Sequence, residues 1–140
     1  MAAVPEMTSS SYLAAIRAIG EVTQALDSLA VRLRKRAEVV RVDRVCDPRT
    51  SATGASVEWF VDSELISGEA LSWHLVVYWS DGEWIIESGV RRIGAEGSDP
   101  EVELATRFAL DEDLAEELAS ATRTLIVTES KIKFVADGTG

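Results

Sequence analysis

The strongest local constraint in the sequence is the pair Asp81-Gly82, which stands between two apolar runs. An Asp-Gly pair in that position is typical of a two-residue β-hairpin turn. A type I′ turn needs positive φ at both central residues, and its twist matches that of the flanking strands. A turn centred there places Trp79 opposite Trp84. It also fixes which residues share a face, because a slip of one residue would exchange the two faces.

One face of this predicted hairpin is apolar and the other is mixed. The apolar face carries Trp73, Leu75, Val77, Trp79, Trp84, Ile86 and Val90, with Ser88 among them. The mixed face carries Ser72, His74, Val76, Tyr78, Ile85, Glu87, Gly89 and Arg91. An apolar sheet face must be buried against another layer, so we expect helices to cover it.

Further strands are predicted on both sides of the hairpin. Residues 37–46 are rich in valine, and from Ala55 onward Val57, Trp59 and Val61 alternate with Glu58, Phe60 and Asp62. Residues 47–54 and 94–100 contain proline, glycine and small polar residues, which predicts loops.

The C-terminal third is less clear from the sequence. Strict alternation over Val102 to Leu110 favours a strand, although Ser98-Asp99-Pro100 would also begin a helix well. A helix is expected from Asp111, and the run at 125–135 offers a last strand.

An N-terminal helix is predicted from about Ser11 to Lys35, with serines as its cap. Apolar residues there recur at alternating spacings of four and three, which is a heptad seam. Such a helix is roughly 37 Å long at 1.5 Å per residue, longer than most sheets that it could lie against. Two interpretations remain open: part of the helix packs on a second copy, or all of it lies on its own sheet. The dimer seam would consist of Tyr12, Ile16, Ile19, Leu26 and Leu33.

The expected fold is therefore α+β. It has a long N-terminal helix, a mainly antiparallel sheet of four to six strands with a tight hairpin at Asp81-Gly82, and a C-terminal helix on the same sheet face. We expect a single domain over residues 1–140, with residues 1–8 and 136–140 as loose ends.

Charge and composition narrow the classes of partner. Residues 47–140 carry nineteen acidic against seven basic groups, which disfavours nucleic-acid binding. The basic run Arg32 to Arg36 fits the C-terminal end of a helix. Residues 1–11 lack an export pattern, and no apolar run approaches the ~18 residues of a membrane span. The absence of asparagine and the excess of arginine over lysine indicate a bacterial source, and we expect a cytoplasmic protein.

Candidates for chemistry are few. His74, Glu87 and Tyr78 share the mixed face of the hairpin, where His74 and Glu87 lie diagonally at roughly 7–8 Å between backbones. They are weak candidates for acid-base catalysis, and the competing interpretation is an exposed imidazole balanced by a carboxylate. Cys46, the only cysteine, is expected to be an unreactive thiol. With one histidine and one cysteine we expect no metal site. The sequence contains no glycine-rich phosphate-binding motif, so we expect no nucleotide cofactor.

Four tryptophans are assigned to the apolar face, where they form either core or the lining of a pocket between sheet and helix: Trp59, Trp73, Trp79 and Trp84. The sequence thus favours a small acidic protein-binding module of the adaptor, secretion-chaperone or immunity type, non-catalytic and dimeric, with another protein, a basic one, as its partner. The alternative is a small-molecule binding protein or simple acid-base enzyme that uses a Trp-lined cup.

Overall fold

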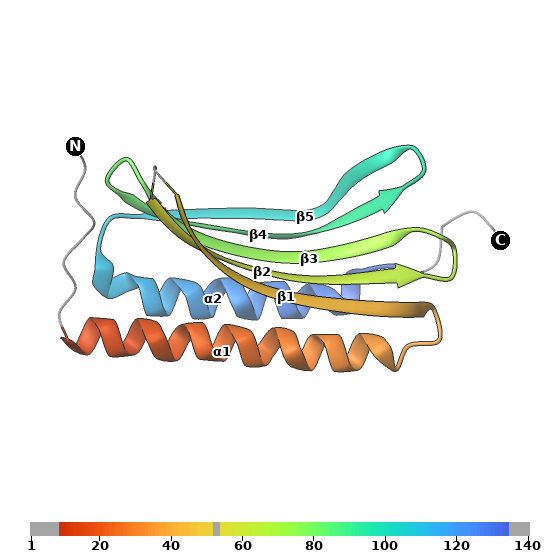
Figure 1. The fold of residues 1–140 in the computed structure, drawn as a ribbon, viewed down its shortest axis with the longest axis horizontal. Helices are drawn as coiled ribbons and strands as arrows, with labels where there is room; N and C mark the ends of the chain where they lie inside the picture. The colour runs from red at the N-terminus through yellow and green to blue at the C-terminus, as the bar shows by residue number, and fades with distance from the viewer. Residues whose placement is uncertain (1–8, 52–53, 135–140) are drawn as a thin grey trace.

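The chain forms one five-stranded antiparallel sheet with two helices on one of its faces (Figure 1). The computed structural model describes the backbone of residues 9–51 and 54–134, and the side chains of residues 13–46 and 56–134. The elements, in order, are α1 (Ser9–Arg34), β1 (Val39–Ser51), β2 (Gly54–Leu65), β3 (Ala70–Ser80), β4 (Glu83–Gly94), β5 (Gly97–Phe108), the 3-10 turn η1 (Asp111–Asp113), α2 (Leu114–Val127) and the 3-10 turn η2 (Thr128–Lys131).

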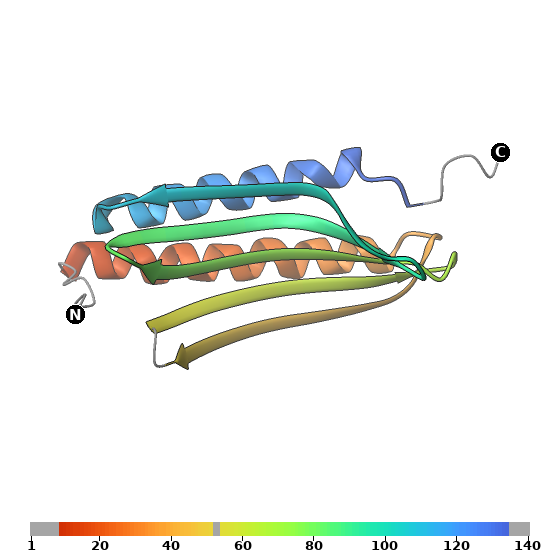
Figure 2. The same cartoon turned by 90° about the horizontal axis from the view of Figure 1, so that it is seen from above.

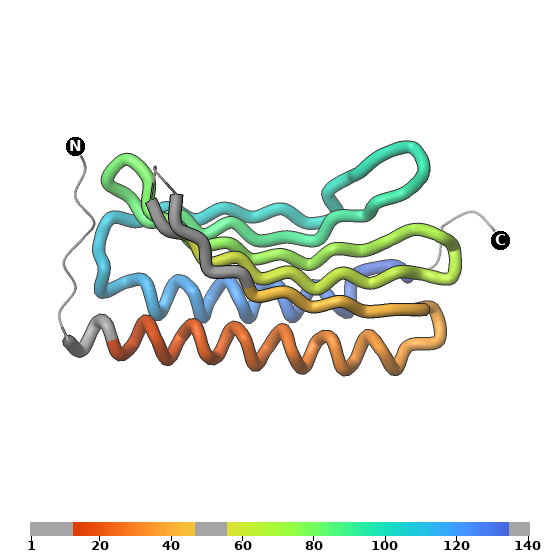
Figure 3. The backbone as a smooth tube through the Cα atoms, in the orientation of Figure 1, coloured from red at the N-terminus to blue at the C-terminus, as the bar shows by residue number. Residues whose placement is uncertain are grey.

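The strands follow one another as a meander in the order β1-β2-β3-β4-β5, which Figure 3 traces along the backbone. α1 and α2 lie side by side and run in the same direction, as the views in Figures 1 and 2 agree. Neither helix lies on the opposite face of the sheet (Figure 1). The expected α+β fold, with both helices on one sheet face, is confirmed.

The hairpin at Asp81-Gly82 has the predicted register. Trp79 pairs with Trp84, and the pairing continues without a shift to Ala70 and Ile93. The φ angles of Asp81 and Gly82 are 52° and 80°, which are the positive values that the turn requires. The two indoles of the Trp79 and Trp84 pair meet edge to face, with ring centroids 5.3 Å apart.

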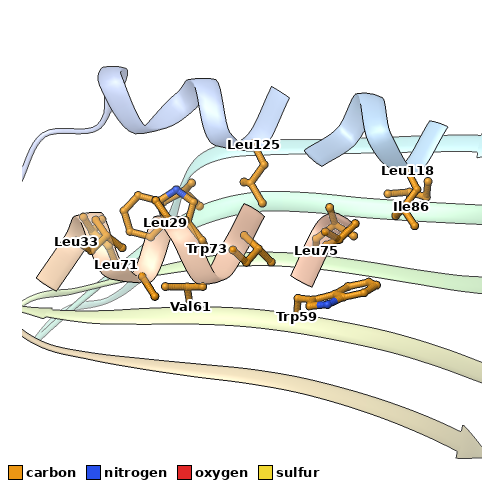
Figure 4. Close-up of a cluster of buried hydrophobic side chains, with 14 of the residues drawn as sticks. Leu29, Leu33, Trp59, Val61, Leu71, Trp73, Leu75, Ile86, Leu118 and Leu125 are labelled. Carbon is orange, nitrogen blue, oxygen red and sulfur yellow. The ribbon is translucent and has the colours of Figure 1, made fainter. Parts of the chain in front are cut away.

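The core fills the space between the sheet and the two helices (Figure 4). α1 contributes Leu29 and Leu33, α2 contributes Leu118 and Leu125, and these side chains are buried. The sheet contributes Trp59, Val61, Leu71, Trp73, Leu75 and Ile86, which are likewise buried. The alternation that predicted an inward face of the central strands is therefore confirmed by burial.

Two segments predicted as loops are mostly strand. β1 continues through Pro48 to Ser51, and β5 begins at Gly97, before Pro100. Both prolines lie in the outermost strands of the sheet, where a residue without an N–H can be tolerated on the open side. A register shift places Val102 opposite Val90 and Pro100 opposite Arg91, so Glu101 is the extra residue of a bulge.

The strand at Val102 to Leu110 is confirmed, since β5 covers that run up to Phe108. The last strand suggested at 125–135 is wrong. α2 continues to Val127 and is followed by η2. Buried residues Leu114, Leu118, Thr122, Leu125 and Thr128 recur every three or four residues, so the helical period extends into the β-branched run.

Candidate functional site

The sheet face that faces away from both helices is the best candidate for a site, and we call it the outer face. Strand alternation and register place 25 described residues on it: Arg41, Asp43 and Val45 of β1, Ser56, Glu58, Phe60, Asp62 and Glu64 of β2, Ala70, Ser72, His74, Val76, Tyr78 and Ser80 of β3, Glu83, Ile85, Glu87, Gly89, Arg91 and Ile93 of β4, and Ser98, Pro100, Glu103, Ala105 and Arg107 of β5.

The centre of the outer face is apolar. Val45 lies opposite Phe60, and Phe60 lies opposite His74 on the next strand. Tyr78 lies opposite Ile85, which is flanked on its other side by Arg107 of β5. Ile85 is only 3% exposed although no helix lies on this face, so its neighbours on the sheet cover it. An apolar band therefore crosses β1 to β4. It runs diagonally from Phe60 to Val76 and Ile85, and Glu58 and Glu87 lie on either side of Val76.

Charged groups lie beside and within this band, and most are acidic. The outer face carries seven carboxylates, those of Asp43, Glu58, Asp62, Glu64, Glu83, Glu87 and Glu103, against the three guanidinium groups of Arg41, Arg91 and Arg107. Arg41 contacts Asp43 at 3.0 Å and Arg107 contacts Glu83 at 3.5 Å. After these pairings the acidic excess remains, so the outer face has a negative potential.

His74 lies against a glycine that has no room for a side chain. A Cβ on Gly89 would lie 2.2 Å from the carbonyl oxygen of Val102 and 3.2 Å from Cε1 of His74. Because Gly89 has no side chain, both the backbone of β5 and the imidazole of His74 can lie close to its Cα atom. Burial lowers the pKa of His74 and Arg91 lowers it further, while Glu103 and Glu87 act in the opposite direction. The imidazole is therefore neutral near pH 7.

The predicted trio of His74, Glu87 and Tyr78 shares the outer face, but the structure joins only two of them. The Tyr78 hydroxyl donates a hydrogen bond to Oε1 of Glu87 at 3.0 Å. Burial, followed by this hydrogen bond, raises the pKa of Tyr78 above its usual value. Among the hydrogen bonds of the described residues, none links His74 to either partner. The hydrogen bond holds the side chains of Tyr78 and Glu87 in place relative to each other. This arrangement suits binding better than proton transfer to His74.

The tryptophans lie on the other side of the sheet. Trp59 and Trp73 are 2% and 0% exposed, and Trp73 stacks on Phe134 at 6.2 Å between centroids. Trp84 donates from Nε1 to Oδ1 of Asp111 at 2.8 Å. Nε1 of Trp73 and of Trp79 are buried without a hydrogen-bond partner within the described part of the chain. Trp59 and Trp73 are thus packed into the core, and the ligand pocket suggested for them stays a prediction.

The proposed dimer seam follows the side of α1 that turns toward its own domain. Leu26 and Leu33 are buried, Ile19 is half-buried, and Ile16 is exposed. The side chain of Tyr12 lies outside the described residues. Cys46 is free and exposed on β1. The structure therefore uses Leu26 and Leu33 within the monomer, and only the N-terminal end of the seam faces outward.

Phe60, Val45 and Arg107 belong to the outer face but were not singled out from the sequence. The alternation in β2 placed Phe60 opposite to Trp59, so that signal was available. The positions of Val45 and Arg107 depend on the pairing of β1 and β5, which the sequence did not specify. The site therefore spans strands that only the sheet brings together.

Comparison of the chain with known protein families, curated proteins and solved structures finds no significant match. Neither helix, over the residues described, has the length and apolar character to cross a membrane. Among the side chains that the structure describes, no group of three or more His, Cys, Asp or Glu residues is arranged to hold a metal ion.

Proposed function

We propose that this protein is a small acidic protein-binding module, of the adaptor, secretion-chaperone or immunity type, and that it binds a basic partner on its outer face. The observation that carries the proposal is the apolar band across β1 to β4, which neither helix covers and which lies among an excess of carboxylates. An antiparallel sheet often leaves one face in water, but that face is then usually polar. In this protein the centre of the outer face is apolar.

The chemistry of the partner follows from the two parts of this surface. Phe60, Val76 and Tyr78 offer apolar contact, while Glu64 and Asp62 on one side and Glu103 on the other offer carboxylates. A segment that presents apolar side chains flanked by Lys or Arg would satisfy both. Charge of this kind mainly speeds and selects encounter, and the buried apolar contacts hold the complex.

The small-molecule alternative has less support. It would use the tryptophans together with His74, Glu87 and Tyr78. The tryptophans face the helices, whereas the other three residues are on the outer face, so the sheet separates the two groups. A surface that binds another protein does not need the tryptophans and the other three residues to meet in one place.

The test uses a fluorescently labelled amphipathic peptide of lysine and leucine, and the same peptide with glutamate in place of lysine. Fluorescence anisotropy should show binding of the basic peptide alone, weakened by added salt because the charges are exposed. Val76→Lys places a cation at the apolar centre and should weaken binding by about tenfold or more. Ser120→Lys adds the same charge on the exposed side of α2 and should leave affinity unchanged.

Two results would refute the proposal. One is that the basic and the acidic peptide bind equally well, or that neither of them binds. The other is equal loss of affinity in Val76→Lys and Ser120→Lys, which would point to net charge instead of the outer face. Circular dichroism of both variants checks that the fold is retained.

A further inference from the structure

A second surface lies on α1, on the side turned away from the sheet and from α2. Leu13, Ile16 and Val31 are 63%, 54% and 46% exposed there. At 100° per residue, Leu13 and Val31 fall on the same line along the helix, and Gly20 lies beside that line between them. This stripe is the middle of the outward side of α1. The helix α1 itself lies on the other side of the sheet from the outer face (Figure 1).

Gly20 has no evident role within the monomer. It lies in the middle of a 26-residue helix, where glycine is the least favourable residue apart from proline. A Cβ built on Gly20 meets nothing within 4 Å, and its φ is not positive. Neither a close neighbour nor an unusual backbone within the described chain therefore requires glycine. What glycine does allow is a close approach of another backbone from outside.

The charges along the stripe are self-complementary. From the N-terminal end the stripe carries Leu13, Arg17, Gly20, Gln24, Asp27 and Val31. When the helix is paired with an antiparallel copy of itself about a two-fold axis, Leu13 meets Val31 of the copy and Arg17 meets Asp27. Gly20 then meets Gln24 on either side of the axis, which passes at the level of residue 22. In such an isologous contact every pairing occurs twice.

We propose that a second copy of this chain packs antiparallel on the outward side of α1, with the backbones closest at Gly20. The stripe carries one cation, Arg17, and one anion, Asp27, and it therefore lacks the acidic excess that selects a basic partner on the outer face. Asp27 also bonds Arg44 of β1, which fixes the carboxylate at the edge of the stripe. This inference replaces the seam through Leu26 and Leu33, which are buried, and goes beyond the proposed binding function.

The contact is small. Leu13 and Val31 are separated by roughly 27 Å along the helix axis. One helix pair of this length buries less surface than a standard protein interface of about 1,600 Å². We therefore expect a weak dimer that forms as the protein concentration rises.

The first test is sedimentation velocity of the full chain over a range of concentrations, with Gly20→Gln and the matched control Ser120→Gln. Both substitutions introduce the same side chain at an exposed helix position. Gly20→Gln should weaken the dimer by at least about tenfold, and Ser120→Gln should not. A wild-type chain that stays monomeric at about millimolar concentration, or a dimer insensitive to Gly20→Gln, overturns the proposal.

The second test fixes the direction of the helices. In a Cys46→Ser background, Leu13→Cys chains are mixed with Val31→Cys chains under oxidising conditions. The antiparallel pairing predicts a disulfide between the two kinds of chain, and none between identical ones, because a disulfide needs Cα atoms about 4.4–6.8 Å apart. Cross-linking of Leu13→Cys with itself would contradict the pairing. Gly20→Gln should still bind the basic peptide, so failure of the dimer and failure of the outer face are distinguishable.

Discussion

Nε1 of Trp59 in β2 donates a hydrogen bond to Oγ1 of Thr23 in α1 at 3.0 Å, and Thr23 in turn donates to the carbonyl of Ile19 at 3.0 Å. A buried indole is thereby satisfied by the helix that covers it. Trp73, on the neighbouring strand, is buried without such a partner within the described chain. The two tryptophans therefore give a matched comparison of a satisfied and an unsatisfied buried N–H.

Trp59→Phe should lower the free energy of unfolding more than Trp73→Phe, by about 1–3 kcal/mol. Both changes shrink a buried ring, but Trp59→Phe loses a hydrogen bond whereas Trp73→Phe removes a buried donor that has no partner. Urea unfolding followed by circular dichroism measures the difference. If Trp73→Phe is the more damaging of the two, the hydrogen bond to Thr23 is not what distinguishes these positions.

Gly89→Ala should destabilise the fold by about 2 kcal/mol or more, because the new Cβ would lie 2.2 Å from a backbone oxygen of Val102 and force β4 and β5 apart. Gly94→Ala in the same strand is the control. A Cβ at Gly94 meets only the flexible side chain of Glu69, at 3.6 Å, so we expect a change within about 0.5 kcal/mol. Thermal unfolding of the two variants checks this, and equal losses would contradict the close approach at Gly89.

Gly82→Ala and Gly20→Ala should have opposite effects, although a Cβ at either position meets nothing within 4 Å. Gly82 has a φ of 80°, where a side chain costs about 1–2 kcal/mol. Gly20 lies in a helix, where alanine is more favourable by about 1 kcal/mol. Unfolding at a concentration low enough for monomers should show a loss for the first variant and a gain for the second. A gain for Gly82→Ala would refute the type I′ turn.

The free energy of unfolding should fall as the pH drops below about 6.5, the ordinary value for histidine. Burial and then Arg91 lower the pKa of His74 in the folded state, so the unfolded chain binds more protons between the two pKa values. His74→Gln should flatten the pH dependence in that window. Arg91→Gln should raise the pKa of His74, followed by the NMR shift of its ring protons, with Glu103 and Glu87 left in place. A folded pKa above 6.5 would contradict the burial of the imidazole.

The hairpin was predictable because its information is local. Asp81-Gly82 fixes a turn type, the turn fixes the register, and alternation then assigns Trp73 and His74 to opposite faces of β3. The separation of tryptophans from the trio of His74, Glu87 and Tyr78 followed from residues close together in the chain. So did the N-terminal helix, and so did the alternation that favoured a strand at Val102 to Leu110 over the helix that Ser98-Asp99-Pro100 could also begin.

Features that depend on contacts between distant parts of the chain did not follow from such local patterns. Pro48 and Pro100 suggested loops, but β1 and β5 became edge strands, and only the sheet order shows that an edge tolerates proline. The seam of α1 was visible, yet whether Leu26 and Leu33 meet the sheet or another copy depends on how α2 and the sheet close around them.

The sequence by itself determined the turn, the register and the two faces of the central hairpin, because these follow from backbone geometry and side-chain period. The apolar hairpin face also predicted that both helices cover it. Only the tertiary structure decided which residues of distant strands meet on the other face, among them Phe60, Val76 and Tyr78. Side-chain period is a local property, so it does not say which strands lie side by side until the whole chain is packed.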